Sequence, residues 1–143
     1  MWSAEYTKEF KGVTAKAIWA AWADVNNWPQ WDVELDKTSM IGPFAPGSRF
    51  QLRPKGGPTV SIEIIEANPY RTFVDVTKFP LAKMIDYHEI QETSDGVLLK
   101  SKISVHGPFG WLWKKIVAKD VAAGVPAQME ALVAYAQKQQ RQT

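Results

Sequence analysis

The sequence predicts an α+β fold in which a curved antiparallel sheet of about six to seven strands wraps around a long C-terminal helix. Short strand-like segments, separated by turns rich in Gly and Pro, fill the middle of the chain. The last third instead shows apolar residues at three- and four-residue spacing, which is typical of a helix. An aromatic corner over residues 24–32 predicts short helices after the first strand. With 143 residues and no repeat or linker, we expect one domain over residues 1–143.

The N-terminal segment predicts a strand followed by a short helix. Residues 2–10 alternate loosely between apolar and polar side chains and run up to Gly12, which is typical of a strand. Thr14 is well placed to cap the helix that follows. The apolar face of that helix is expected to consist of Ala15, Ile18, Trp19 and Trp22.

The corner after this helix contains two tryptophans and a proline. Asn26 and Asn27 are expected to end the helix. Trp28-Pro29-Gln30-Trp31 then predicts a turn or a single helical turn that starts at Pro29. We expect the two tryptophans to hold this corner against the sheet rather than to bind a ligand.

Six strand-like segments follow, and the short loops between them predict an antiparallel meander. They cover residues 33–41, 48–53, 59–66, 71–78, 82–92 and 97–106.

A long amphipathic helix is predicted over residues 109–140. At about 1.5 Å per residue it would be roughly 40 Å long. Pro126 lies in its interior, where a proline removes one backbone hydrogen bond, so we expect a kink or a break there. The residues with helical spacing are Trp113, Ile116, Val117, Val121, Val125, Met129, Leu132 and Ala136.

The composition excludes several classes of function. The formal net charge is +2 and the basic residues are scattered, so no nucleic-acid partner is expected. The chain has no cysteine, which excludes disulfides and thiolate zinc sites. No long apolar run predicts a membrane-spanning helix, and residues 1–10 lack a signal-peptide core, so we expect a cytoplasmic protein. The glycines at 56–57 and 107–110 lack the Lys-Ser/Thr of a phosphate-binding loop, and no cofactor is expected.

The chain resembles the helix-grip superfamily, which includes START domains, birch-pollen-allergen-like proteins and polyketide cyclase/dehydrase-like proteins. The resemblance is carried by residues 17–24 with the following Val-Asn-Asn-Trp-Pro-Gln-Trp stretch, by the hairpin over residues 59–73, and by Leu-Val-Ala-Tyr-Ala at 132–136. It spans essentially the whole chain. Pro126 departs from the family's continuous last helix.

This resemblance implies a helix-grip ligand-binding domain over residues 1–143 that encloses a small apolar molecule, such as a lipid or polyketide, between the sheet and the last helix. It supplies no universal catalytic residue, because the scaffold hosts several functions. Two alternatives stay open. One is a polyketide cyclase or dehydratase that uses a His and an Asp of the cavity, and the other is a co-chaperone-like interaction module. The ligand, turnover and the oligomeric state are not predicted.

The strand over residues 82–92 offers the best candidates for chemistry. Met84, Asp86, His88 and Ile90 share one face, and the two apolar members suggest that this face is the inner one. A carboxylate can orient an imidazole as a general base, so Asp86 and His88 are the candidate catalytic residues. The predicted ligand-contacting residues are Met84, Asp86, His88, Ile90, Leu99, Ser101, Ile103, Trp113, Val117 and Val121.

Other polar residues give weaker signals. Asp75 becomes a second buried carboxylate if Phe73 faces inward, but both faces of its strand carry apolar residues, so its orientation is open. His106 is expected on the surface, and two isolated histidines make a poor metal case, so no metal site is predicted. Arg49 and Arg53 are expected in solvent, opposite Phe50 and Leu52.

A cluster of aromatic and basic residues opens the last helix. Trp111 and Trp113, with the neighbouring Lys114 and Lys115, could meet a membrane surface or pack on the core. We expect core packing of the helix start.

Overall fold

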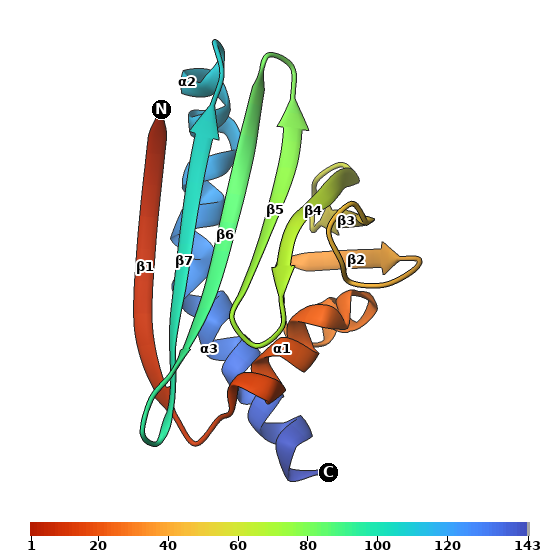
Figure 1. The fold of residues 1–143 in the computed structure, drawn as a ribbon. Coiled ribbons are helices and arrows are strands. Elements are labelled where there is room, and N and C mark those ends of the chain that lie inside the picture. Colours follow the sequence, from red (N-terminus) through yellow and green to blue (C-terminus); the bar gives the residue numbers. More distant parts are fainter. Residues whose placement is uncertain (143) are drawn as a thin grey trace.

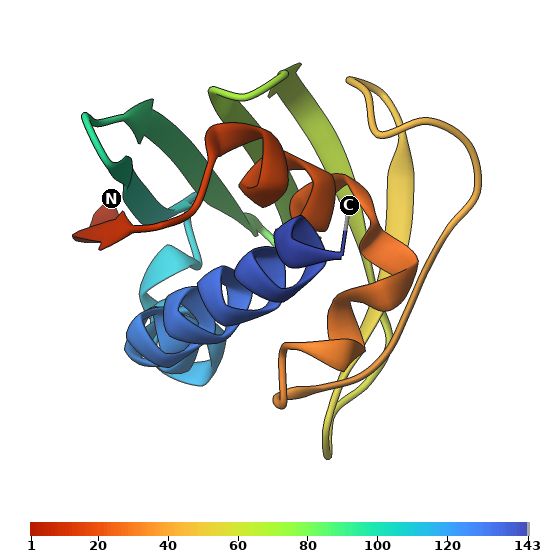
Figure 2. The ribbon, with the colours of Figure 1, turned by 90° about the horizontal axis from the view of Figure 1, so that it is seen from below.

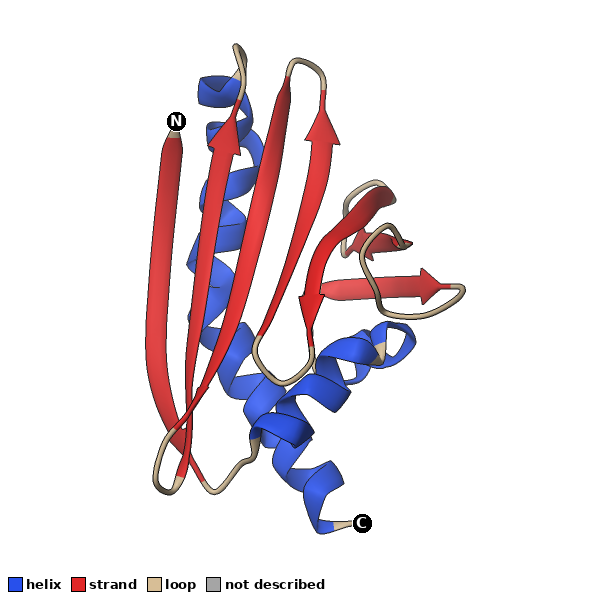
Figure 3. Cartoon of the chain, viewed as in Figure 1, coloured by secondary structure: helices blue, strands red, loops and turns tan. Residues whose placement is uncertain are grey.

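The computed structural model describes residues 1–142 and shows one curved sheet with helices on its concave side (Figures 1 and 3). Strand β1 (Trp2–Lys11) leads into helix α1 (Ala15–Ala23) and the 3₁₀ helix η1 (Val25–Gln30). The other strands are β2 (Leu35–Met40), β3 (Arg49–Pro54), β4 (Val60–Asn68), β5 (Thr72–Phe79), β6 (Ala82–Glu92) and β7 (Gly96–His106). The C-terminal helices are α2 (Gly110–Trp113), the π turn η2 (Lys114–Ala118) and α3 (Lys119–Arg141).

The seven strands form one antiparallel sheet in the order β1-β7-β6-β5-β4-β3-β2. Strand β1 therefore pairs with the last strand, while β2 and β3 lie at the opposite edge. Figure 2 shows the sheet curving around α3, with α1 and η1 at the side of that helix. Side chains of both layers form one apolar core. The predicted α+β architecture of a curved antiparallel sheet, a long C-terminal helix and two short helices after the first strand is confirmed.

Helix α1 begins as predicted. The Thr14 Oγ1 hydroxyl accepts a hydrogen bond from the Ala17 backbone N–H over 3.0 Å, which satisfies one free donor of the first turn. The buried face differs by one residue from the expected one, because Ala21 is buried whereas Trp19 is only half-buried. Trp19 instead packs edge-on against Phe44, with their ring centres 5.6 Å apart.

The corner after α1 is structural, but its local form differs from the prediction. Asn26 and Asn27 do not act as a break, because both lie inside the 3₁₀ helix, and Pro29 lies near the end of that helix rather than at its start. Side-chain hydrogen bonds explain this: the Asn26 side chain pairs with the Met40 backbone N–H and C=O of β2. The buried Trp28 indole N–H donates to the carbonyls of Ala21 and Trp22, over 3.2 and 3.0 Å, and so closes the end of α1.

The C-terminal helix runs through Pro126, so of the predicted kink or break at that residue the break is wrong. The irregularity lies earlier, in the π turn of η2. From Ala118 onward the buried positions keep a regular helical spacing, and they are Ala118, Val125, Met129, Leu132, Val133 and Ala136. Ile116 lies within this π turn and is exposed despite its apolar spacing.

Within residues 1–142 no helix has the length and apolar character needed to cross a membrane.

Candidate functional site

The candidate site lies on the concave faces of β5 and β6. Asp75 is directly opposite Asp86 in the sheet, and Phe73 is directly opposite His88. Phe73 and Asp75 are both buried, so the Phe face of β5 is the inner one. Val74 on the other face is buried as well, which is why the sequence pattern could not orient this strand. The structure therefore adds Asp75 to the predicted pair Asp86 and His88.

The His88 ring is held in one orientation by its neighbours. It stacks on the Phe73 ring with the centres 3.8 Å apart and the planes 8° apart, and the Trp22 ring meets it edge-on at 5.6 Å. His88 Nδ1 lies 3.2 Å from the Phe73 carbonyl oxygen. A carbonyl oxygen can only accept, so Nδ1 carries the hydrogen of this bond. Nε2 then faces Asp86, whose Oδ1 is 3.4 Å away.

The two carboxyl groups are held in an unfavourable environment for negative charge. Burial raises the pKa of Asp75 well above its usual range, and the nearby Asp86 charge raises it further. Burial also raises the pKa of Asp86, while the charge of His88 acts in the opposite direction. Asp86 Oδ1 is buried and makes no hydrogen bond within residues 1–142. The cluster can therefore hold a proton or a cation at a place that water reaches poorly.

The inner face of β7 borders this cluster. The sequence pattern predicted correctly which side chains of β7 face inward. Leu99, Ser101 and Ile103 are all buried. Ser101 lies opposite His88 in the sheet, and Ile103 lies opposite Asp86. The polar cluster thus continues into a single hydroxyl and is otherwise enclosed by apolar side chains. Met84 and Ile90, at the two ends of the β6 face, are buried as expected.

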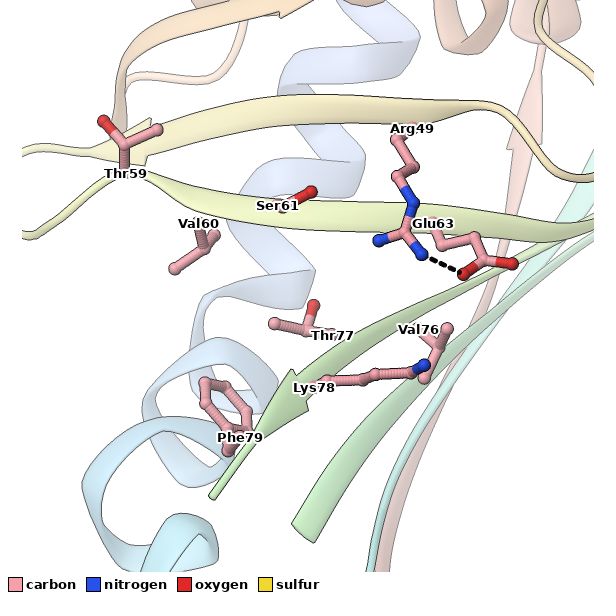
Figure 4. A pocket seen from close by; sticks show the side chains of 9 residues that line it. All are labelled: Arg49, Thr59, Val60, Ser61, Glu63, Val76, Thr77, Lys78 and Phe79. Carbon is pink, nitrogen blue, oxygen red and sulfur yellow. Dashed lines mark hydrogen bonds and ion pairs between the residues drawn. The ribbon is translucent and has the colours of Figure 1, made fainter. Parts of the chain in front are cut away.

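A pocket of about 330 Å³ opens where β4 and β5 separate, and its lining includes none of Asp75, Asp86 and His88 (Figure 4). Pairing between these strands ends at Ile62 and Thr77, so β5 continues to Phe79 without β4 beside it. Thr77 shares the inner face with Asp75, two residues away, or about 7 Å at ~3.3 Å per residue. The lining residues are Arg49, Thr59, Val60, Ser61, Glu63, Val76, Thr77, Lys78 and Phe79.

A second hollow, of about 930 Å³, is open and polar. It lies at the turn between β4 and β5 and is lined by Glu66, Asn68, Pro69, Arg71, Thr72, Glu89, Ile90 and Gln91. Neither hollow is the enclosed cavity that was predicted between the sheet and α3. The residues of that layer pack against one another in the apolar core.

The three predicted ligand contacts on the C-terminal helices occupy different environments. Trp113 stacks on Phe79, a wall of the 330 Å³ pocket, with the ring centres 4.5 Å apart. Its indole N–H donates to the Pro80 carbonyl over 3.0 Å. Val117 is half-buried against the core. Val121 is 36% exposed and lies outside the buried face of α3, so the helix offers Trp113 and Val117 to the site but not Val121.

Several predicted surface residues lie apart from the cluster. His106 is half-buried and contacts Ser104 Oγ at 3.0 Å through Nε2. Arg49 and Arg53 are exposed as expected and form ion pairs with Glu63 and Asp36. His106 and the two arginines therefore take no part in the Asp75–Asp86–His88 cluster.

The start of the C-terminal helix presents an exposed apolar end. Trp111 is 59% exposed, and Leu81, Phe109 and Ile116 are also exposed. The turn that carries Leu81 contacts this end directly, because the Phe109 N–H donates to the Leu81 carbonyl over 3.1 Å. The expectation of core packing holds for Trp113 and not for Trp111. Exposed apolar surface of this kind is what an interaction module would present.

Comparison with models of protein families identifies the family of this chain. The model described as "Polyketide cyclase / dehydrase and lipid transport" matches residues 1–137. The chain belongs to this family. No curated protein sequence matches it. As a member of this family it belongs to a group that handles small hydrophobic molecules, by transport or by cyclisation.

Solved structures share the fold of this family member at low sequence identity. A hypothetical protein from Helicobacter pylori matches with a TM-score of 0.76 at 16% identity, over 94% of this chain and 88% of that one. The protein Ara h 8.0201 matches with a TM-score of 0.73 at 15% identity, over 96% and 99% of the chains. Norcoclaurine synthase from Thalictrum flavum, solved as a point mutant with a transition-state analogue, matches with a TM-score of 0.72 at 12% identity, over 97% of both chains. These likenesses show the fold.

The residues that the sequence pattern did not assign to the site lie on β5 and α1. Phe73 and Trp22 fix the His88 ring, and Thr77 links the cluster to the pocket. Their positions depend on the pairing of β5 with β6, which places Asp75 against Asp86. The one available signal was the Phe-x-Asp-x-Thr alternation over residues 73–77, which two buried valines obscured.

Proposed function

We propose that this protein binds a small, largely apolar molecule that carries one polar oxygen or nitrogen group. The polar group would contact Asp75, Asp86 and His88, and the apolar part would lie along the concave face toward the pocket between β4 and β5. The observation that carries this proposal is the adjacency of the two features: Thr77 lines the pocket and shares an inner strand face with Asp75.

The pocket itself supports a ligand with a polar part, because six of its nine lining residues are polar or charged and three are apolar. A pocket of about 330 Å³ lies at the small end of the usual range of small-molecule sites, roughly 300–1,000 Å³. Such sites are mostly apolar with a few converging polar groups that fix the orientation of the ligand. Here the polar groups lie on adjacent strands, next to the apolar Phe73 and Ile103.

Binding of 1-anilinonaphthalene-8-sulfonate, an aromatic probe with one polar head, tests the proposal. The chain is expected to bind it at one site per molecule with a blue shift of its fluorescence. Val60→Trp fills the pocket and is expected to weaken binding at least tenfold. Glu9→Trp, at an exposed position of β1 on the far edge of the sheet, is the matched control and should leave binding unchanged.

Two results would overturn this assignment. One is the absence of saturable binding by the native chain. The other is an equal effect of Val60→Trp and Glu9→Trp, because the pocket between β4 and β5 would then have no part in binding.

A second candidate function is acid–base catalysis at the same cluster, as in a cyclase or dehydratase. Burial raises the pKa of Asp75, so its carboxyl group keeps a proton to higher pH than an exposed aspartate does, while His88 Nε2 faces Asp86 as a proton acceptor. Exchange of the α-protons of 2-tetralone in D₂O, followed by NMR, tests this. A protein-dependent rate that His88→Gln lowers about a hundredfold or more, and His106→Gln does not, would support catalysis. An unchanged rate in His88→Gln would exclude His88 as the base.

A further inference from the structure

The polar cluster on β5 and β6 has a second property, which is the convergence of three potential metal ligands. One carboxylate oxygen of Asp75, one of Asp86 and one ring nitrogen of His88 all lie within 4.8 Å of one another. Within residues 1–142 no other group of three or more His, Cys, Asp or Glu side chains converges in this way. The sequence spacing predicted no metal site, because Asp75 comes from a different strand and its orientation was open.

The imidazole is already oriented as a metal ligand. His88 donates its Nδ1 hydrogen to the Phe73 carbonyl, so the lone pair of Nε2 points to the other ligands. A hydrogen bond from the second ring nitrogen to a carbonyl is the usual support of metal-bound histidines. The 3.4 Å between Nε2 and Asp86 Oδ1 is close to the roughly 3.3 Å that two ligands have around a tetrahedral ion with bonds of about 2.0–2.1 Å.

Within residues 1–142 the carboxyl groups of the cluster have only the His88 ring as an ion-pair partner. Asp75 is only 6% exposed, and its carboxyl group forms no ion pair within residues 1–142. Within the described residues 1–142, neither Asp75 nor Asp86 forms an ion pair with a Lys or Arg side chain. Two opposed buried carboxylates are costly when ionised, and a divalent cation between them would remove that cost.

We propose that Asp75, Asp86 and His88 bind one divalent transition-metal ion, with Zn²⁺ as the best-suited candidate. One imidazole and two carboxylates form a ligand set that Zn²⁺ accepts, and three protein ligands leave at least one coordination position open toward the interior. The inference does not rest on the proposed ligand-binding function, because metal binding is measured without an organic ligand.

Isothermal titration of Zn²⁺ into the tag-free, chelator-treated chain tests the proposal. One ion is expected to bind per chain with a Kd in the micromolar range or below, accompanied by proton release because the carboxyl groups must ionise. Asp75→Asn, Asp86→Asn and His88→Gln are each expected to weaken binding at least tenfold. His106→Gln removes the other histidine and is the matched control, which should bind as the native chain does.

A spectroscopic measurement keeps the test independent of the folding of the variants. Addition of one equivalent of Zn²⁺ to the native chain is expected to shift the NMR ring signals of His88 and leave those of His106 in place. The proposal is overturned by the absence of one-to-one binding, by native-like binding in His88→Gln, or by a shift confined to His106. Failure of the 1-anilinonaphthalene-8-sulfonate assay would leave these readouts untouched, so the two proposals fail separately.

Discussion

Asp75 is the residue whose environment departs furthest from that of an ordinary side chain of its kind. It lies on the inner face of β5 between Ile64 on β4 and Asp86 on β6. Both its burial and the neighbouring carboxylate disfavour the ionised form. The ionisation of Asp75 therefore makes the stability of the folded protein depend on pH.

Asp75→Asn is expected to stabilise the metal-free protein at neutral pH. In the unfolded chain the Asp pKa is about 3.9, whereas in the folded chain it is raised. Below pH ~4 the carboxyl is protonated in both states. As the pH rises through the folded pKa, the native protein loses the stability that the protonated form retains. The asparagine does not ionise, so its advantage grows with pH to roughly 1–3 kcal/mol, the usual cost of a buried unsatisfied group.

Urea unfolding from pH 4 to pH 8 in a chelating buffer measures this difference. Asp95→Asn, at the exposed β6–β7 turn, is the control and should show no comparable growth of the difference with pH. A destabilised Asp75→Asn at pH 7 would show that the ionised carboxylate is satisfied in the native state.

Residues of the site could be predicted from the sequence only on a strand where the alternation of apolar and polar side chains was unambiguous. On β6, the apolar Met84 and Ile90 determine the inner face and so place Asp86 and His88 correctly. On β5, Phe73 and Val74 are both buried on opposite faces, and the pairing register across the sheet decides the orientation. Register is a long-range property that a single strand does not carry. Most of the fold was predictable because helical spacing and Gly/Pro turns are local signals.

At the scale of elements, the C-terminal helix combines features that would weaken an isolated helix. Gly124 and Pro126 both lie inside α3, and Pro126 lacks the N–H that would pair with the residue four positions earlier. The helix is nevertheless continuous, because Val125 and Met129 are buried in the core beside these positions. Tertiary packing thus prevents the break that the local signal allowed.

Gly124→Ala is expected to raise the free energy of unfolding by about 0.5–1 kcal/mol. A Cβ atom at this position would meet no heavy atom within 4 Å, so the gain in helix propensity has no steric cost. Chemical denaturation measures the change. Gly96→Ala is the contrasting variant and should destabilise, because its Cβ would lie 1.9 Å from the Phe10 carbonyl oxygen.

Pro126→Ala is expected to stabilise α3 by about 1–3 kcal/mol, since it restores one backbone hydrogen bond in the helix interior. The greater freedom of the unfolded alanine chain reduces the gain. Thermal unfolding with hydrogen exchange of the amides of residues 119–130 measures it. A loss of stability would show that the proline ring contributes packing that outweighs the missing bond.

At the scale of the whole molecule, the aromatic corner connects the N-terminal third to the last helix. Asp32 follows η1 and is buried, and one of its carboxylate oxygens accepts a hydrogen bond from the Gln128 side chain of α3 over 2.8 Å. The other oxygen accepts from the Glu34 backbone N–H over 3.0 Å. One carboxylate thus joins segments 96 positions apart in the chain.

A double-mutant cycle on Asp32 and Gln128 is expected to show coupling. Asp32→Ala should cost about 1–3 kcal/mol, because it removes two hydrogen bonds to a charged carboxylate. Gln128→Ala should cost less, and the double variant should be more stable than the sum of the two single effects predicts, by about 0.5 kcal/mol or more. Strict additivity in urea unfolding would mean that the 2.8 Å contact contributes nothing to stability.

The π turn of η2 also affects which changes in chain length the C-terminal helix can accommodate. A π turn holds one residue more than the α-helical turn it replaces. Removal of a single residue between Lys114 and Ala118 would therefore convert this stretch to ordinary α-helix without displacing the buried positions from Ala118 onward. In most helices, an insertion or deletion rotates all the residues that follow it about the helix axis. Here the part of α3 that packs on the sheet would keep its position, and only the exposed apolar end of the helix would rotate.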